Sequence, residues 1–375
     1  MTEGIQLNIP QRLSLIRTVL TISLVVSVLM SFNLWAGERS FPYAPALESP
    51  FMNTWAGALL LGLSVLLLLG SIVFKAQRIF IFLGLAIYAL LVLNDVNRLQ
   101  PWFYVYSVML FVFVCYNGRV DDSNRFTSFF ILLQIILASV YFFSGLNQWR
   151  MANGVDAYLE LIQPLKSVLS MRQYAFAQKT AVLAPFVLMF IGIGLVIKPT
   201  RYLAVSLALL VHVLLLVLLF PAGNRFNLSI WFCNISFAVL VMVLFSGKTK
   251  QRYFSPTYLF RMPLFYLIMA LFTILPLFNS RGLWPDYLSA NFNTVNNRRA
   301  GILISKVVYE NLSDYHRYFC TPRGRMYIMD YNAWCNYELR VSCAPEKKVV
   351  KAVSDYLNAL DKQAVKETEL ALSAP

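Results

Sequence analysis

Charged residues are scarce in this sequence. Lysine, arginine, aspartate and glutamate make up only 13% of its 375 residues, about half of their share in an average soluble domain. Hydrophobic residues make up 58%, and the mean hydropathy is +0.61. A soluble chain of this length could not cover so much apolar side chain with so few charges, which excludes a disordered protein, a cytosolic enzyme and a disulfide-stabilised mini-protein. What remains is a polytopic membrane protein.

Residues that bind metals or nucleotides are also few. The chain has two histidines, His212 and His316, in different regions, and no pair of histidine and glutamate has the spacing of metal ligands. A P-loop, a glycine-rich dinucleotide fingerprint and a C-x-x-C motif are all missing from the sequence, and we find no internal repeat. We therefore predict no metal site, and neither nucleotide chemistry nor thioredoxin-type redox chemistry is encoded in a readable form.

Long hydrophobic segments, in contrast, fill the chain up to about residue 280. There are nine, at residues 13–35, 54–74, 79–94, 102–116, 127–146, 180–197, 202–220, 228–246 and 263–279. Most approach the ~20 residues that a helix needs to cross a bilayer, whereas the third and fourth are shorter. No small-x-small cleavage site follows the first segment, so we expect an uncleaved helix there. The pattern predicts an all-α membrane bundle of about nine transmembrane helices.

The net charge of +14 follows the rule that cytoplasmic loops of membrane proteins are basic. With the N-terminus inside, the inner segments hold twelve basic residues, against seven in the outer loops before the C-terminal region. An odd number of spans then places the C-terminus outside. We predict a cytoplasmic N-terminus, an extracytoplasmic C-terminus, a lipid bilayer as the surroundings and no nucleic-acid partner.

Composition changes abruptly after Asn279, which predicts two domains. Residues 1–279 form the transmembrane domain, and residues 280–375 have no long apolar run and form a small extracytoplasmic α+β domain. Residues 301–308 and 325–330 are rich in β-branched and aromatic residues and are expected to be strands. From Pro345 onward the apolar residues recur at helical spacing, which predicts a helix.

The cysteines divide between the two domains. Cys115 and Cys233 fall in hydrophobic segments and are expected to be small core residues. Cys320, Cys335 and Cys343 fall in the C-terminal domain. In an oxidising compartment, one disulfide among these three candidates is expected, with one thiol left over.

The connection between the fifth and sixth segments is unusually long. Apolar residues in Tyr158–Leu169 follow helical spacing, with Pro164 in the middle. This pattern predicts an amphipathic helix on the outer leaflet, bent at the proline. The same pattern also suits a helix packed on the bundle or a lid over a pocket.

Polar residues within apolar spans are informative, because they cost free energy unless they face a partner or a cavity. Four segments place such residues at a similar depth, toward the outside. These residues are Asp95, Arg98, Tyr141, Gln148, His212, Asn227, Trp231 and Asn234. Tyr141 and Gln148 share one face of their helix, as do Trp231 and Asn234. The depth predicts a pocket that opens outward; the alternative is hydrogen bonding between helices and anchoring at the interface.

Three stretches of sequence resemble a known family. They are Asp95–Trp102, Tyr141–Trp149 with the sequence Tyr-Phe-Phe-Ser-Gly-Leu-Asn-Gln-Trp, and His212 with the following Phe220–Asn234. Together they resemble the HTTM membrane domain of vitamin K-dependent γ-carboxylases and many bacterial proteins, with DoxX-like proteins as a looser relation. The resemblance covers roughly residues 13–280. It implies the fold, a bacterial inner membrane location and a pocket for a lipophilic quinone or lipid.

The chain departs from the carboxylases at their catalytic lysine pair. Asn147 and Gln148 stand at those places, and an amide cannot take up a proton at useful pH. The carboxylases' early histidine aligns best with Arg98, and only His212 matches a histidine of the family. The resemblance therefore argues against carboxylation. It leaves His212 as a catalytic acid or base and Arg98 as a group that holds an anionic part of the ligand.

Three classes of function remain open at this point. The first is a membrane enzyme or carrier that acts on a quinone or lipid, with a quinone as the cofactor or ligand. The second is a non-catalytic membrane subunit whose outer domain docks an exported protein partner. A transporter is a third class, but paired repeats and charges within the membrane, which are typical of transporters, are not evident.

Overall fold

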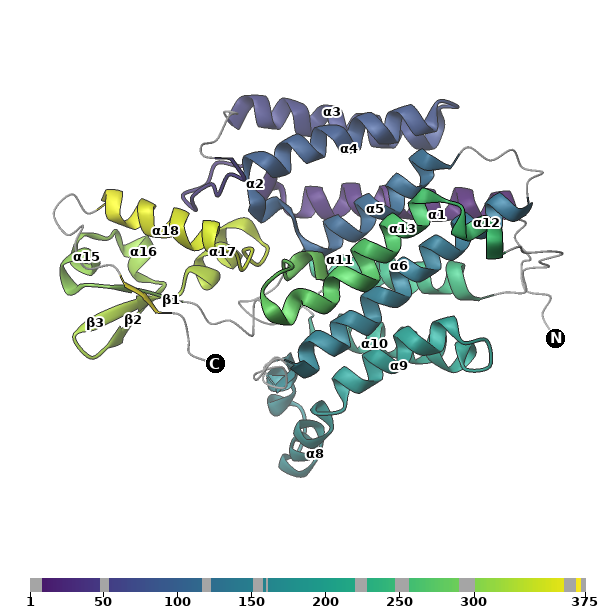
Figure 1. Ribbon diagram of the computed structural model, residues 1–375. Coiled ribbons are helices and arrows are strands. Elements are labelled where there is room, and N and C mark those ends of the chain that lie inside the picture. Colours follow the sequence, from purple (N-terminus) through teal and green to yellow (C-terminus); the bar gives the residue numbers. More distant parts are fainter. Residues whose placement is uncertain are drawn as a thin grey trace.

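The computed structural model describes residues 9–47, 54–116, 123–150, 158–159, 161–219, 228–246, 256–289, 301–360 and 369–371. Long helices form a bundle, and a small domain of helices and strands lies at the end of the bundle opposite the N-terminus (Figure 1). The structure is mostly helical, and its many apolar helices are compatible with an integral membrane protein.

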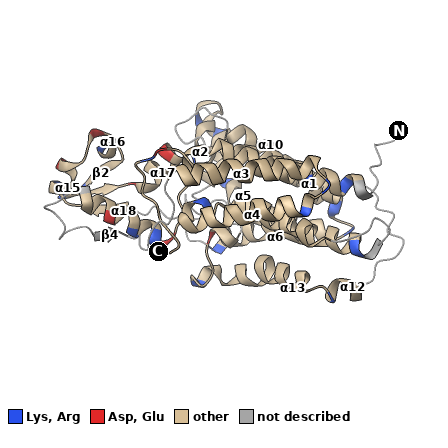
Figure 2. Ribbon diagram, turned by 90° about the horizontal axis from the view of Figure 1, so that it is seen from above, with Lys and Arg blue, Asp and Glu red and all other residues tan. Residues whose placement is uncertain are grey.

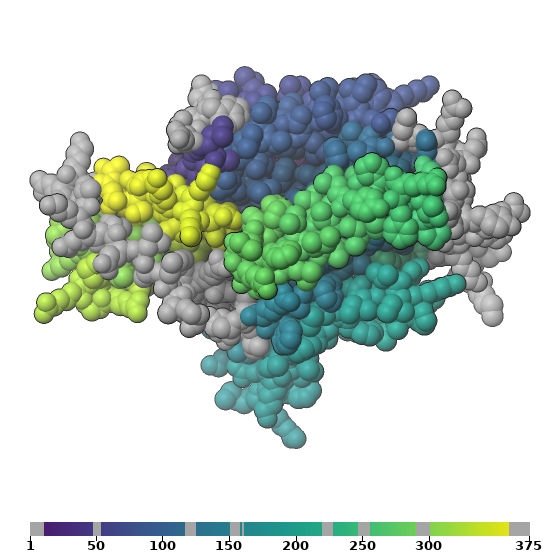
Figure 3. Space-filling model, in the orientation of Figure 1, coloured from purple at the N-terminus to yellow at the C-terminus, as the bar shows by residue number. Residues whose placement is uncertain are grey.

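The bundle begins with α1 (Ile9–Met30), the short α2 (Phe32–Trp35) and the pair α3 (Thr54–Val73) and α4 (Gln77–Asn94). A 3-10 turn, η1 (Val96–Arg98), leads to α5 (Pro101–Cys115) and α6 (Ser123–Arg150). Then come η2 (Gln163–Ser167), α8 (Met171–Ala181), α9 (Ala184–Val196), α10 (Arg201–Leu218) and α11 (Leu228–Phe245). The last elements are α12 (Pro256–Phe260), α13 (Pro263–Met269), η3 (Ala270–Ile274), η4 (Leu275–Arg281) and η5 (Tyr287–Ser289). In Figure 3 the green segment from α13 to η4 lies along one face of the bundle.

Each of the nine hydrophobic segments falls on helical structure. Within the described residues, seven helices are long and apolar enough to cross a membrane, and α8 with α9 passes the same test as a pair bent by 52°. α5 has 15 residues and is therefore about 22 Å long, less than the ~30 Å hydrocarbon core. Seven or eight candidate spans are thus established, and the count of nine stays a prediction.

α5 is apolar on all sides because other helices surround it. Ten of its residues are buried, among them Trp102, Tyr106 and Met109. α3 and α10, in contrast, expose large apolar side chains such as Trp55, Leu66 and Val213. So wide an exposed apolar surface would be unstable in water and suits contact with lipid.

The connection before α8 agrees in part with the prediction of an amphipathic helix over Tyr158–Leu169. Residues 158, 159, 161 and 162 are helical, but a 3-10 turn, η2, follows and includes Pro164, and a longer helix starts at Met171. Ser170 and Gln173 form a capping box in which each side chain binds the other residue's backbone N–H. This reciprocal cap fixes the start of α8 after the proline rather than before it.

The C-terminal domain packs helices on a small antiparallel sheet. Its elements are β1 (Gly301–Ile304), α15 (Lys306–Asn311), α16 (Asp314–Arg317), β2 (Cys320–Arg323), β3 (Met326–Met329), α17 (Tyr331–Leu339), α18 (Lys347–Leu360) and β4 (Glu369–Ala371). The strand order is β2-β3-β1, with the short β4 added beside β1. A small sheet with helices confirms the predicted α+β character of this region.

Two expectations for this domain need correction. The strand predicted over residues 301–308 ends at Ile304, because Ser305 caps a helix by accepting a hydrogen bond from the Val308 N–H at 3.2 Å. The helix α17 and the strand β2 were not predicted. The predicted C-terminal helix is present as α18, whose buried face holds Val349, Val353 and Leu357.

Glycine allows α6 and α9 to pack closely. A Cβ atom on Gly192 of α9 would lie 2.7 Å from the Ala138 carbonyl oxygen and 2.7 Å from the Phe142 nitrogen, both on α6. Gly145 of α6 similarly faces the Pro185 carbonyl oxygen, 2.3 Å from the position of a Cβ. Small residues at such crossings bring two backbones into contact, which is a main source of helix association in lipid.

We predict that Gly192→Ala destabilises the bundle by about 2 kcal/mol, since the added methyl group collides with backbone that cannot move without separating the helices. Thermal unfolding of the purified protein in detergent measures the change. Gly62→Ala is the matched control, because a Cβ there meets nothing within 4 Å, and it should leave stability unchanged or slightly higher. Equal unfolding midpoints for the two variants would contradict the tight crossing.

Candidate functional site

Three of the predicted site residues meet inside the bundle. The Tyr141 hydroxyl on α6 lies 2.5 Å from Nε2 of His212 on α10. Nδ1 of the same imidazole lies 2.9 Å from Oδ1 of Asn234 on α11. All three side chains are buried, with exposed fractions of 5%, 4% and 6%. We call Tyr141, His212 and Asn234 the buried triad.

The amide of Asn234 determines the direction of every hydrogen bond in the triad. Its Nδ2 donates to the Ile230 carbonyl oxygen at 2.9 Å, so its Oδ1 faces the imidazole. His212 must then carry its proton on Nδ1, and the Nε2 lone pair of a neutral imidazole accepts from Tyr141. The only proton of the Tyr141 hydroxyl is thereby used, and its oxygen keeps lone pairs that can accept another hydrogen bond.

Neighbouring aromatic residues hold the imidazole in place. The ring of Phe237 stacks on His212, with centroids 6.2 Å apart and planes inclined by 25°. Trp231, predicted as a pocket residue, donates from Nε1 to the Leu216 carbonyl oxygen at 3.0 Å and so ties α11 to α10 beside the triad. Its role here is to position two helices. Phe237 was missed by sequence reasoning, since an apolar residue in an apolar helix gives no signal.

Gln148, the other predicted pocket residue on α6, and its neighbour Asn147 have different partners. Gln148 accepts a hydrogen bond from the Tyr158 hydroxyl. Asn147 donates to the Ser289 carbonyl oxygen at 3.3 Å. The two amides therefore fix the C-terminal end of α6 to nearby connections. Asn227 lies outside the described residues.

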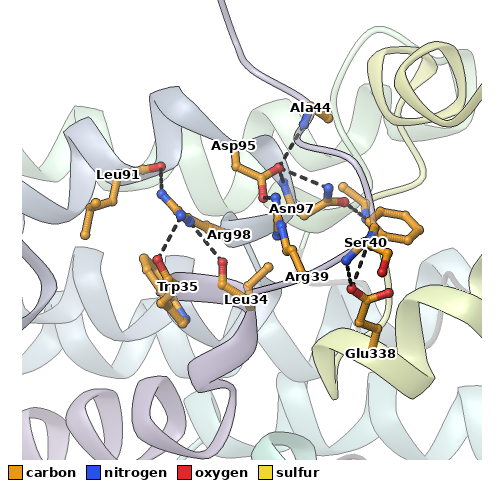
Figure 4. Close-up of polar contacts among 12 residues, drawn as sticks. Leu34, Trp35, Arg39, Ser40, Ala44, Leu91, Asp95, Asn97, Arg98 and Glu338 are labelled. Carbon is orange, nitrogen blue, oxygen red and sulfur yellow. Dashed lines mark hydrogen bonds and ion pairs between the residues drawn. The ribbon is translucent and has the colours of Figure 1, made fainter. Parts of the chain in front are cut away.

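Asp95 belongs to a second cluster, shown in Figure 4. Its Oδ2 pairs with Nη2 of Arg39 at 2.5 Å, and the side chains of this ion pair are only 0% and 1% exposed. Its Oδ1 accepts from the Ala44 nitrogen at 3.2 Å and from the Asn97 backbone and side-chain nitrogens at 3.1 and 3.0 Å. The Arg39 guanidinium also stacks on the Tyr43 ring at 3.7 Å. The carboxylate thus holds the segment after α2 against the end of α4.

Arg98 caps the ends of two helices. Nη1 donates to the Leu91 carbonyl oxygen in the last turn of α4, at 2.8 Å. Nε and Nη2 donate to the Leu34 and Trp35 carbonyl oxygens of α2, at 3.1 and 2.8 Å (Figure 4). Burial lowers the pKa of Arg98 to about 10, so the group stays cationic at neutral pH and stabilises these carbonyl ends. These contacts favour a structural role, and we do not retain Arg98 as the holder of an anionic ligand group.

The predicted single pocket therefore divides into two clusters. Within the described residues, no hydrogen bond, ion pair or ring contact joins Asp95 or Arg98 to Tyr141, His212 or Asn234. A similar depth along the helices predicted both groups, but depth does not specify which way a side chain points.

Residues in and beside the second cluster also form hydrogen bonds with the C-terminal domain. Oδ1 of Asn97 accepts from the Ala344 nitrogen at 3.1 Å, and Gln100 donates to the Ser342 carbonyl oxygen at 2.9 Å. The Glu338 carboxylate accepts from the backbone nitrogens of Ser40 and Phe41 (Figure 4). Asp95 and Arg98 thus stabilise the surface on which this domain docks.

The three cysteines of the C-terminal domain are free thiols in the structure. Cys335 and Cys343 are both buried beside α17, where Cys335 donates to the Val341 carbonyl oxygen at 3.5 Å and Cys343 donates to Oδ1 of Asn332 at 2.7 Å. Cys320 is partly exposed and lies on β2, with its sulfur 3.5 Å from the His316 carbonyl oxygen. The predicted disulfide stays a prediction, but the geometry singles out one pair.

Comparisons with known proteins add no name to these observations. The chain matches no family model, no curated protein and no solved structure. Across the residues that the structure describes, no group of three or more histidine, cysteine, aspartate or glutamate residues could hold a metal ion. The buried triad is therefore the strongest candidate site on geometry alone.

We predict that Asp95→Ala lowers the free energy of unfolding by about 3–5 kcal/mol, because it leaves the buried Arg39 charge without its partner. Chemical denaturation of the full chain in detergent measures the loss. Adding Arg39→Met to Asp95→Ala should recover part of it, since the unpaired charge is then gone. Asp355→Ala, on the exposed face of α18, is the control, and its effect should be within ~0.5 kcal/mol. An Asp95→Ala protein as stable as the control would rule out this dependence.

Proposed function

We propose that this chain is an integral membrane protein of HTTM type whose bundle binds a lipophilic, hydroxyl-bearing ligand at the buried triad. A quinol is the ligand class that we favour. A lipid with a free hydroxyl group could donate the same hydrogen bond and is the alternative ligand. The observation that carries the proposal is the hydrogen-bonded arrangement of Tyr141, His212 and Asn234 among apolar helices.

In the triad, the Tyr141 oxygen can accept a hydrogen bond from a ligand, and His212 can act as the base that receives the Tyr141 proton. A ligand hydroxyl can donate to the Tyr141 oxygen, whose own proton is already directed at Nε2 of His212. Transfer of the ligand proton to Tyr141, and of the Tyr141 proton to His212, would leave an imidazolium whose Nδ1–H still binds Asn234. Such a relay is general base catalysis, and a polar group of this kind inside a membrane span is usually functional.

The relay differs from carboxylase chemistry. Asn147 and Gln148 are engaged with Ser289 and Tyr158, and neither amide can accept a proton as the carboxylase lysine does. We therefore propose that the site binds and deprotonates a ligand hydroxyl group, and that it does not catalyse carboxylation. An enzyme and a ligand carrier both agree with this arrangement.

The proposal includes the nine-span topology in a bacterial inner membrane, with the N-terminus cytoplasmic and the C-terminal domain extracytoplasmic. The excess of basic residues in the predicted inner segments supports this orientation. Figure 2 shows lysines and arginines at the end of the bundle near the N-terminus, whereas the C-terminal domain at the opposite end carries both basic and acidic residues. α5 can serve as a span although it is short, because protein rather than lipid surrounds it.

One observation favours a second candidate function, a subunit that docks an exported protein partner. Tyr318 and Tyr337 of the C-terminal domain are 74% and 54% exposed, and Tyr315 lies beside Tyr337 with ring centroids 6.1 Å apart. Exposed tyrosines in a group are typical of protein interfaces.

We predict that Tyr141→Phe weakens binding of a long-chain benzoquinol about tenfold, which is the loss of roughly one hydrogen bond. Fluorescence titration in detergent, with native mass spectrometry of the complex, measures the affinity. Tyr88→Phe is the matched control, because it removes the same hydroxyl group from another buried tyrosine of the bundle. His212→Ala should weaken binding at least as much as Tyr141→Phe, since it removes the base and reorients Tyr141.

The ligand provides a second control. A quinol with both hydroxyl groups methylated cannot donate to Tyr141, so it should bind the native protein about tenfold more weakly than the free quinol. Equal affinity of the native, Tyr141→Phe and His212→Ala proteins for the quinol would refute the site. A co-purifying protein that is lost on Tyr318→Ala, with no bound lipid or quinone, would favour the second candidate.

A further inference from the structure

We propose that Cys335 and Cys343 form a disulfide in the mature protein, and that this bond fixes the segment on which the C-terminal domain docks to the bundle. The inference rests on the proposed extracytoplasmic location of this domain, because disulfides persist in oxidising compartments. It assigns a covalent modification to one pair among three cysteines.

The turn after α17 brings the two thiols together. α17 ends at Leu339, and Arg340 adopts a left-handed conformation with φ 58°, which reverses the chain. Val341–Ala344 then runs back along the helix, so that its carbonyl oxygen at Val341 lies 3.5 Å from the Cys335 sulfur. The Cys343 thiol donates to Oδ1 of Asn332 at 2.7 Å, and Asn332 lies about one helical turn before Cys335 on α17. Both thiols therefore lie against the same part of α17, and Cys343 is among the neighbours that raise the pKa of Cys335.

The returning segment carries several of the docking contacts. The Ser342 carbonyl oxygen accepts from Gln100 at 2.9 Å and from the Tyr287 hydroxyl at 3.0 Å. The same hydroxyl donates to the Cys343 carbonyl oxygen at 2.7 Å, and the Ala344 nitrogen donates to Asn97. A bond between Cys335 and Cys343 would therefore join the docked segment covalently to α17, the helix that also carries Glu338.

Formation of the bond is a two-electron oxidation. The two thiols lose two protons and two electrons as the sulfur–sulfur bond forms, and the disulfide of an exported thiol oxidase is reduced to a dithiol. Burial raises the pKa of the Cys335 thiol, so the reactive thiolate is disfavoured once the domain is docked. Oxidation is therefore easiest before the thiols are buried, and the finished bond is shielded from reductants.

Cys320 provides an internal comparison. It is partly exposed on β2, and burial raises the pKa of its thiol to about 11, so it stays protonated at neutral pH. Its thiol donates to the His316 carbonyl oxygen of α16 rather than to a group of α17 or of Val341–Ala344. We expect it to remain the unpaired thiol.

Tryptic peptide mapping of the full chain tests the pairing directly. The three cysteines fall on three different tryptic peptides, residues 318–323, 326–340 and 341–347. The protein is produced in its membrane, denatured in N-ethylmaleimide without reductant, and digested. The expected result is a linked species of peptides 326–340 and 341–347, which separates on reduction, while the peptide 318–323 carries the maleimide.

A set of cysteine-to-alanine variants keeps the peptide mapping informative even if one substitution prevents folding. Cys335→Ala and Cys343→Ala should each abolish the linked species and leave the remaining partner alkylated, whereas Cys320→Ala should retain it. The double variant Cys335→Ala with Cys343→Ala shows whether folding depends on the bond or on the thiols. Alkylation of both cysteines in the native protein, or a bond to Cys320, would overturn the proposal.

Location is measured separately. In a Cys320→Ala background, Tyr318→Cys places a thiol at a position that is 74% exposed. Labelling of intact cells by a membrane-impermeant maleimide is expected. Labelling without the linked species would overturn the disulfide while leaving the topology intact; labelling only after lysis would overturn the topology and the disulfide with it.

Discussion

The buried ion pair between Arg39 and Asp95 is the interaction on which the two halves of the molecule depend. Both side chains are almost fully shielded from solvent, so either charge alone would be strongly destabilising. One carboxylate oxygen neutralises the arginine, and the other orders Ala44 and Asn97. Asn97 in turn binds Ala344 of the C-terminal domain. The ion pair therefore orders the bundle side of the contact with the domain, which the hydrogen bonds of Glu338 and Gln100 also join.

Hydrophobic patterning predicted the helices of the bundle well, because a span must be apolar over its whole length in lipid. It was less informative where short-range chemistry decides the outcome. Val307 and Val308 are β-branched and were predicted to continue the strand, but the Ser305 cap starts a helix at Lys306. The start of α8 is set by the reciprocal bonds of Ser170 and Gln173, which outweigh the apolar period of the preceding residues. Such caps depend on one or two residues and are easily overlooked beside a long periodic signal.

The candidate site could be predicted only in part. Tyr141, His212 and Asn234 were found because polar residues deep in apolar helices must have partners. Asp95 and Arg98 lie at a comparable depth, but their side chains serve the turn after α4. Depth follows from the sequence, whereas the direction of a side chain is set by the neighbours that accept its hydrogen bonds. Those neighbours are mostly backbone carbonyls, such as that of Ile230, which carry no signature in the sequence.

The fixed amide of Asn234 has a consequence for the oxidation state of a ligand. Because its orientation directs the imidazole proton to Nδ1 and the Tyr141 proton to Nε2, the Tyr141 hydroxyl presents an acceptor and no spare donor. A reduced ring with a hydroxyl group complements that acceptor, whereas the carbonyl oxygen of the oxidised ring would face another lone pair. One hydrogen bond to the Ile230 carbonyl oxygen would thus let the protein retain a reduced ligand and release it once its electrons have been passed on.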